Sequence, residues 1–413
     1  MRYLFISLFI LYTIYGKAQT LETYFEIGAK NNPGLKAKYM DFEAALLKFP
    51  QVTQLPDPSF SLTAIGRMVE TRVGPQQARL SLSQMFPWFG TLKAQGEVAT
   101  LMAETKYQSF LDMRNKLFYQ ISLAYYPLHE LEKLIRIEQE NINILESYKI
   151  ITNFKFQNGS SSMADVLRVE IMLKDAKTSL KILNEKQKPL LTNFNKLLNR
   201  PDDEIVPISE SLTIETEDLS YWKDSLFLKN PSLDELDLKI KTSRANELLA
   251  VKQGYPKLGV GLDYIIVGDR TDLAAGVAPP VDNGKDAFML MFSATIPLFR
   301  GKYDAAVKEA QVMQGVYALQ KEELKNTLTS SYEMTTFELF QQKEMYELFD
   351  EQTKETQQIL NLLYSSYSNS GKDFDELLRV QQQLLRYQKM QAMTLTQYHN
   401  ALAKLYYITS KTF

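Results

Sequence analysis

The sequence Asn32-Pro33-Gly34-Leu35 recurs about 200 residues later as Asn230-Pro231-Ser232-Leu233. Outward from these segments, further matching pairs follow in the same order: Pro58 and Pro256, Pro87-Trp88-Phe89 and Pro297-Leu298-Phe299, and Leu167-Arg168-Val169 and Leu378-Arg379-Val380. The spacing between partners grows by about twelve residues between Pro256 and Pro297, which indicates one insertion in the second copy. Because a repeat of this length is far longer than a solenoid unit, the sequence predicts an internal duplication of a half-molecule.

The first residues have the pattern of a secretory signal peptide over residues 1–18. A basic start precedes an apolar run from Leu4 to Tyr15, and a small-residue cleavage site follows at Ala18. This run is too short for a spanning helix, and no later segment has the roughly 18 uncharged apolar residues that such a helix requires. If the protein enters a membrane, we expect it to do so with β-strands.

The composition excludes several classes of function. The chain has no cysteine, so a disulfide framework, a thiolate metal site and a lipidated N-terminal cysteine are excluded. A formal net charge of -2 gives no electrostatic footprint for nucleic acid. His129 and His399 do not form a zinc-peptidase pattern, the methionines are scattered, and no phosphate loop or nucleophile elbow occurs. We therefore expect no metal, no cofactor and no enzymatic activity.

Each half begins with two helices. Residues 21–31 and 219–229 are periodic and end at an Asn-Pro pair, because the residue before a proline avoids helical geometry. Second helices are predicted over 35–49 and 233–251. Prolines are expected to end them, namely Pro50, Pro56 and Pro58 in the first half and Pro256 in the second.

The hydrophobic period then changes from near 3.6 to 2 in two predicted hairpins, about 58–87 and 256–297. The alternation is clearest where Leu258, Val260 and Leu262 are separated by small or polar residues. Strands of roughly nine residues could cross a tilted membrane wall. An ordinary hairpin with one wet face gives the same pattern, so the alternation alone leaves both alternatives open.

Each hairpin is followed by a very long helix, over 90–158 and 301–369. At 1.5 Å per residue each would reach about 100 Å. Apolar residues in the first of them step by three and four, as in a coiled-coil seam: Leu117, Ile121, Ala124, Leu128, Leu131, Ile135, Ile142 and Leu145. Pro127 inside this run is expected to kink the helix or to destabilise it by about 3 kcal/mol, unless the freed carbonyl finds another donor. Returning helices then run to about Asn199 and Ser410 and are shorter than the long helices. A short helix stacked end to end on each returning helix would make up the difference. Each half would then supply two full-length staves to a helical tube.

Four strands cannot close a membrane barrel, because such barrels start near eight strands and an open edge in lipid leaves backbone groups unpaired. The chain is therefore expected to share its barrel with copies of itself. Three copies would give a 12-stranded β-barrel and a helical barrel of twelve staves. Each chain is predicted to be mainly α with a small β part.

In this order, the segments resemble the outer membrane efflux proteins, the TolC-like channels of tripartite pumps. The resemblance covers the mature chain and depends on the Asn-Pro after the first helix, residues 84–90 and 296–301, and the segments 159–167 and 370–378. It implies a first repeat over 19–199, a linker over 200–218 and a second repeat over 219–413.

The resemblance also implies a function and partners. It describes a homotrimeric exit duct in the outer membrane lipid that extends into the periplasm and passively conducts substrates outward. Its partners would be a periplasmic adaptor (membrane fusion protein) and an inner-membrane transporter. The stretch Phe86-Pro87-Trp88-Phe89-Gly90 is most similar to the branch that serves cation and heavy-metal exporters of the resistance-nodulation-division type.

Charged residues begin the two returning helices at equivalent places. The resemblance implies that carboxylates here ring the narrow periplasmic mouth, gate it and select cations. The gate candidates are Asp165, Arg168, Asp373, Asp375, Glu376 and Arg379. The alternative is an exposed ion pair three residues apart on one helical face, and acidic residues favour the first turn of any helix.

Turn-forming residues separate each long helix from its returning helix. Asn and Gly tolerate positive φ, which predicts tight turns at 158–160 and 369–371. The residues are Asn158, Gly159, Ser160, Asn369, Ser370 and Gly371. The resemblance implies that hairpins of the adaptor dock at these tips.

Aromatic residues mark the change from strand to helix in both halves. Phe86, Trp88 and Phe89 in the first half correspond to Phe299 in the second. They predict a collar at a membrane interface, where aromatic rings concentrate. Simple packing of the strand-to-helix corner is the alternative.

Two other classes of function compete with the duct. A periplasmic coiled-coil adaptor or structural protein would share the signal peptide and long helices, but it would not need two hairpins with apolar stripes. An outer-membrane barrel enzyme would need catalytic side chains near the strands, and the sequence shows no such set there.

Overall fold

The computed structural model describes residues 20–208, 212–214, 226–370 and 374–411. The predicted signal peptide, part of the predicted linker, and the tip residues Gly371 and Asp373 lie outside the described residues. Most of the helix predicted over 219–229 also lies outside them. Its described end, 226–229, is a turn and not a helix, and Leu226 is buried there against Tyr332 and Tyr398.

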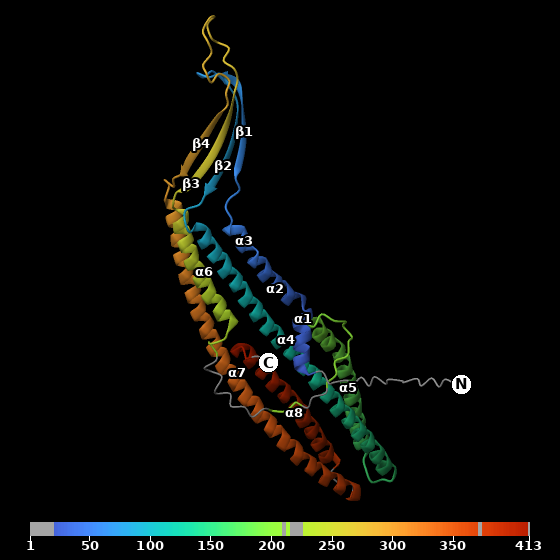
Figure 1. The fold of residues 1–413 in the computed structure, drawn as a ribbon. Coiled ribbons are helices and arrows are strands. Elements are labelled where there is room, and N and C mark those ends of the chain that lie inside the picture. The colour runs from blue at the N-terminus through green and yellow to red at the C-terminus, as the bar shows by residue number, and fades with distance from the viewer. Residues whose placement is uncertain (1–19, 209–211, 215–225, 371–373, 412–413) are drawn as a thin grey trace, which may run out of the picture. The chain divides into compact units, whose positions relative to one another are not determined.

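The described elements follow the predicted order (Figure 1). The first half contains α1 (Leu21–Asn31), α2 (Pro33–Leu46), α3 (Lys48–Thr53), β1 (Ser59–Val69), β2 (Gln76–Phe86), α4 (Thr91–Gln157) and α5 (Met163–Leu197). The second half contains α6 (Pro231–Gln253), β3 (Lys257–Val267), β4 (Ala287–Thr295), α7 (Gly301–Ser370) and α8 (Phe374–Thr409). The prediction of a mainly helical fold with four strands is confirmed.

Two prolines that were predicted to end or kink a helix lie within helices. The helix predicted over 35–49 is divided at Leu47, and Pro50 does not end it but lies in the first turn of α3. Proline is tolerated there because the backbone N–H of a first turn has no partner within the helix. Pro127 lies inside α4, which continues beyond it to Gln157, and the kink expected there stays a prediction.

The chain folds into two compact units. The first unit contains Met1–Ala37, Leu111–Asn230 and Lys325–Phe413, and the second contains Lys38–Phe110 and Pro231–Leu324. Within the residues that the structure describes, no helix is both long and apolar enough to cross a membrane.

The core of the first unit forms along the predicted seam of α4. Every predicted seam residue is buried except Ile135, which is half-buried. The seam packs with α5, α7 and α8 residues such as Val169, Leu360 and Leu377. Glu138 also occupies a seam position and is 1% exposed. Burial of this apolar stripe is what holds such helices together, since helical propensity alone contributes little.

The second unit contains a four-stranded antiparallel sheet in the order β1-β2-β3-β4. The register aligns the predicted alternation across all four strands, for example Phe60 opposite Leu82 and Leu82 opposite Leu262. One side, which we call the apolar face, carries Phe60, Leu62, Leu80, Leu82, Leu258, Val260, Leu262, Tyr264, Phe288, Leu290 and Phe292. The other side, the polar face, carries Ser61, Thr63, Arg79, Ser81, Ser83, Gly259, Gly261, Asp263, Met289, Met291 and Ser293.

Candidate functional site

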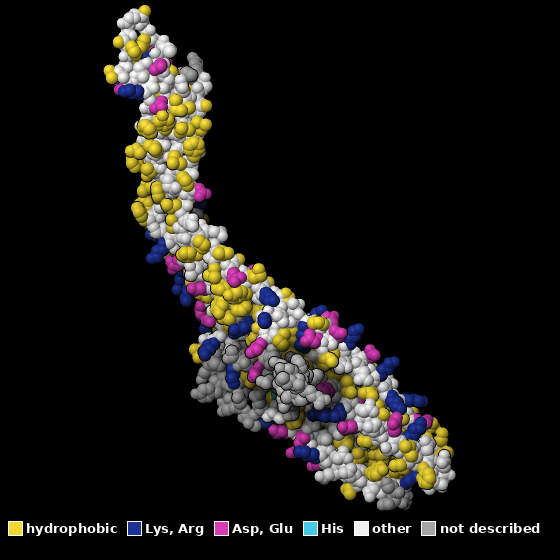
Figure 2. Space-filling model, turned by 45° about the vertical axis from the view of Figure 1, so that its right-hand side comes forward, with side chains coloured by type: hydrophobic (Ala, Val, Ile, Leu, Met, Phe, Trp, Pro, Cys, Tyr) yellow, Lys and Arg dark blue, Asp and Glu magenta, His cyan; other side chains and the backbone are white. Residues whose placement is uncertain are grey.

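The apolar face of the sheet is largely exposed. Phe60 is 66% exposed, Leu290 73% and Phe292 79%. Figure 2 shows hydrophobic side chains gathered over the strands. A contiguous exposed apolar surface of this kind marks contact with lipid or with another protein.

The polar face carries a charged pair. Arg79 of β2 donates a hydrogen bond to Asp263 of β3, and Asp263 is only 1% exposed. Glycines beside this pair make room for larger neighbours, because a Cβ on Gly259 would collide with Ser293 Oγ and Met85 Sδ. The sheet therefore separates charge from apolar surface, as a wall between water and a second medium would require.

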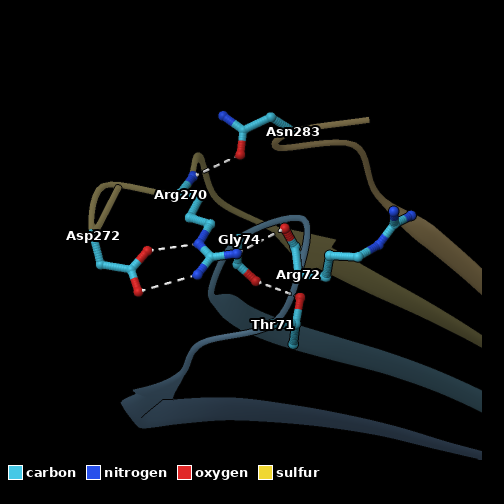
Figure 3. Close-up of polar contacts among 6 residues, drawn as sticks. All are labelled: Thr71, Arg72, Gly74, Arg270, Asp272 and Asn283. Atoms are coloured by element: carbon cyan, nitrogen blue, oxygen red, sulfur yellow. Dashed lines mark hydrogen bonds and ion pairs between the residues drawn. The ribbon is translucent and has the colours of Figure 1, made fainter. Parts of the chain in front are cut away.

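The loops that close the two hairpins are joined by polar contacts (Figure 3). The Arg270 guanidinium donates to Asp272 Oδ1 at 2.7 Å and to the Arg72 carbonyl at 3.3 Å. The Arg270 backbone N–H donates to Asn283 Oδ1 at 3.1 Å. Gly74 has a φ of +122°, and a Cβ there would collide with the Gly268 carbonyl. The hydrogen bond from Arg270 to the Arg72 carbonyl joins the two loops, the other two order the second loop, and the Arg72 side chain points away from them.

At the tip of the first unit, α4 ends in the turn predicted at 158–160. Gly159 has a φ of +72°, and the Ser160 N–H donates to the Lys155 carbonyl at 2.8 Å. The Asn158 side chain donates to the Phe154 carbonyl at 2.9 Å. Asn369 and Ser370 were predicted as a turn but form the last two residues of α7. This helix therefore continues further than α4, its counterpart in the first half.

Asp165 has a structural task at the start of α5. Ser162 Oγ accepts from the Asp165 N–H at 3.2 Å, and Asp165 Oδ2 accepts from the Ser162 N–H at 3.1 Å. This reciprocal capping box satisfies backbone donors that a helix N-terminus leaves free. Ser161 Oγ donates a second hydrogen bond to the same carboxylate at 3.0 Å.

The other described gate candidates form ion pairs. Arg168 lies 3.8 Å from Asp165 and 2.9 Å from Asp375 of α8, and Arg379 lies 3.6 Å from Glu376. The pairs three residues apart match the alternative drawn from the sequence. The Arg168–Asp375 pair joins α5 to α8 and was not predicted, since nothing local connects residues so far apart in the chain.

A buried polar cluster interrupts the seam of α4. Lys389 of α8 donates to Glu138, Asn141 donates to Glu138 at 3.3 Å, and Gln381 donates to Asn141 at 3.4 Å. The Glu138 side chain is 2% exposed and that of Lys389 is 30% exposed. In this register of α8 on α4 the buried Glu138 carboxylate has a charged partner, and a register that separated it from Lys389 would leave it buried and unpaired.

The four predicted collar residues have different environments. Phe89 and Phe299 are 78% and 87% exposed, and Phe86 is 39% exposed. Trp88 is half-buried, and its ring stacks on Tyr255 at a centroid distance of 5.5 Å. The two most exposed rings are available to a membrane interface, whereas Trp88 packs at the corner between strand and helix.

The junction between strands and helices in the second unit forms a cavity of about 840 Å³ that is partly open to solvent. We call it the junction cavity. Its wall includes Trp88 and Tyr255 together with Lys252, Lys257 and Lys302. No signal in the sequence indicated these lysines, because the cavity brings together segments that are far apart in the chain.

Among the described residues, no group of three or more His, Cys, Asp or Glu side chains could hold a metal ion. His399 is buried in the first unit and stacks on Tyr126 at a centroid distance of 5.1 Å. Burial, assisted by the nearby His129, lowers the pKa of His399 to about 4. This histidine is therefore a neutral packing residue at pH 7.

No family model and no curated protein matches this sequence. Solved structures do match over nearly the whole chain. The outer-membrane channel OprN has a TM-score of 0.75 and 16% identity, over 95% of this chain and 90% of OprN. CusC, described for its folding and transmembrane channel formation, has a TM-score of 0.77 and 12% identity, over 94% of this chain and 91% of CusC.

The MtrE outer membrane channel of Neisseria gonorrhoeae, solved in its open state, has a TM-score of 0.73 and 16% identity, over 95% of this chain and 89% of MtrE. Identities this low show the fold. The predicted resemblance in fold to TolC-like outer-membrane efflux channels is therefore confirmed.

Proposed function

We propose that this chain is one subunit of an outer-membrane channel that serves as the exit duct of a tripartite efflux pump. The observation that carries the proposal is the two-faced sheet, with an exposed apolar face and the Arg79–Asp263 pair on the opposite side. A membrane wall needs this segregation, because lipid contacts one side of the strands and water the other. The likeness in fold to OprN, CusC and MtrE supports the same function.

The edges of the sheet support a shared barrel. Within the described chain, β1 and β4 each pair on one side only. Unpaired strand edges are unfavourable in lipid, so strands of other subunits are needed to complete the ladder. Three copies give the 12-stranded barrel, and the exposed apolar side chains of α7, such as Phe337, Phe340 and Leu362, provide further surface for neighbouring copies.

In this proposal the helices extend into the periplasm and the tip turns meet the adaptor of an inner-membrane transporter. The Gly159 turn is exposed, and a Cβ there would meet no atom within 4 Å. Gly159→Pro should weaken adaptor binding, while the matched change Gly276→Pro, at another glycine with positive φ, should not. Adaptor binding that survives Gly159→Pro would contradict docking at this tip.

The experiment that tests the duct is native mass spectrometry of the protein extracted from the outer-membrane fraction, followed by conductance in planar lipid bilayers. We expect three chains per particle and a steady ion conductance. A monomer or dimer that a carbonate wash removes from membranes would contradict the duct. It would favour the periplasmic adaptor, the second candidate, although an adaptor gives no reason for the exposed apolar face.

The duct acts passively, and we propose no enzymatic activity for it. The branch that exports cations and heavy metals stays a prediction from residues 86–90. No metal-binding cluster among the described residues adds to it. Metal sensitivity of a strain that lacks the gene, compared with its sensitivity to organic compounds, would test this assignment.

A further inference from the structure

The junction cavity lies where β2 passes into α4 and where α6 passes into β3. Its lining residues combine cationic, aromatic and aliphatic side chains, for example Lys252, Tyr255 and Leu55. A volume of about 840 Å³ is large enough for a small organic molecule.

The charge in this cavity is unbalanced. Lys252, Lys257 and Lys302 line it, and Asp57 is the single carboxylate among the lining residues that the structure describes. None of the three lysines forms an ion pair within the described part of the chain, in contrast to Arg168 and Arg379 at the tip. Three ammonium groups that share one concave site attract anions and repel cations.

The aromatic side chains provide a second means of recognition. Trp88 stacks on Tyr255 with an interplanar angle of 27°, and Tyr255 is still 39% exposed. Lys252 Nζ lies 5.9 Å from the Tyr255 ring centroid, and Lys302 Nζ lies 4.8 Å from the Tyr303 centroid. A flat ring can therefore pack beside Tyr255 while an acidic substituent on it reaches a lysine.

The position of Lys257 connects the cavity with the polar face. Lys257 begins β3 opposite Thr295, and strand alternation places it on the same side as Gly259 and Asp263. In the proposed duct this side faces the water-filled passage. A solute that crosses the strand-to-helix junction would therefore meet Lys257 of every subunit, at the mouth of the junction cavity.

We propose that the junction cavity is a binding site for small organic anions that carry an aromatic ring. Binding there would favour the passage of such anions over that of cations. This inference rests on the proposed duct. It also opposes the cation-exporter branch, because a ring of lysines disfavours cations.

Binding can be measured by isothermal titration calorimetry on the detergent-extracted, full-length protein. The probes are naphthalene-2-sulfonate, neutral 2-naphthol and cationic 2-naphthylmethylammonium. We expect the sulfonate to bind about tenfold more tightly than the other two, and the variant K252Q/K257Q/K302Q to lose about tenfold of that affinity.

The control variant K106Q/K186Q/K308Q removes the same charge from exposed helical positions outside the cavity. It should bind the sulfonate as the wild type does. Equal affinity for all three probes, or equal loss in both triple variants, would overturn the proposal.

Bilayer recordings separate this inference from the duct itself. Wild-type channels should show a chloride-to-potassium permeability ratio that falls severalfold in K252Q/K257Q/K302Q and stays unchanged in the control variant. Conducting channels with the same ratio in all three proteins would overturn the anion-binding site alone, whereas a wild-type protein that does not conduct would overturn the duct.

Discussion

The sheet of the second unit and the helices of the first unit sort their side chains in opposite ways. In the sheet, Asp263 is 1% exposed and Phe292 is 79% exposed. In the helices, Leu145 and Leu377 are fully buried, and charged side chains lie mostly outside. Glu138 is the exception, since it is buried in the helical seam. The difference shows that the helices enclose an apolar core among themselves, whereas the sheet leaves its apolar face exposed.

The largest expected effect comes from a charge on the apolar face of the sheet. Leu290→Arg should lower the free energy of unfolding in lipid vesicles by about 2 to 4 kcal/mol, because an arginine near the bilayer midplane loses its hydration. Met289→Arg is the matched control, since the neighbouring residue lies on the polar face. Urea titration of both variants would measure this, and equal losses would mean that the two faces do not contact different media.

The next largest effect is expected at Glu138, the charged side chain that is buried among the helices. Lys389→Met should lower the free energy of unfolding by about 3 kcal/mol, because it leaves the Glu138 carboxylate buried without its partner. The double variant E138M/K389M should recover most of this loss, since apolar side chains of similar size suit a buried seam. Urea denaturation would measure both, and a double variant as unstable as Lys389→Met would contradict this explanation.

A smaller, pH-dependent effect is expected at His399. Its pKa is about 4 in the folded chain and about 6.5 when unfolded. Between these two pH values the unfolded state therefore binds more protons than the folded state. The contribution of His399 to the free energy of unfolding is fully present above about pH 6.5. It decreases by roughly 1 kcal/mol per pH unit as the pH falls toward 4.

His399→Phe keeps an aromatic ring against Tyr126 and removes this titration. The difference in unfolding free energy between the two proteins, measured from pH 7.5 to 4.5, should follow the histidine. Identical pH profiles would show that His399 does not contribute to the pH dependence.

The smallest effect on stability, a few tenths of a kcal/mol, is expected for Arg168→Ala, because exposed ion pairs contribute little. The same variant should change the single-channel conductance measurably. We propose that the Arg168–Asp375 pair holds α5 and α8 together at the tip, so its loss should raise single-channel conductance at neutral pH. Lys186→Ala is the control on the same helix, and equal conductance in both variants would exclude a gating role for the pair.

Much of the fold could be predicted from local signals. The change of hydrophobic period placed the hairpins at about 58–87 and 256–297, close to the observed strands. Gly159 placed the first tip turn, because a positive φ is a property of a single residue. The second tip was less accurate: Asn369 and Ser370 continue α7, and helix ends depend on packing as well as on turn formers.

The sequence by itself determined the order of elements, the lengths of the long helices and the alternation of the strands, because these depend on residues that are neighbours in the chain. The tertiary structure alone decided the Arg168–Asp375 pair, the Glu138–Lys389 pair and the junction cavity. Each of these brings together side chains that are far apart in sequence. Their meeting depends on how helices and strands pack, and no local pattern encodes that.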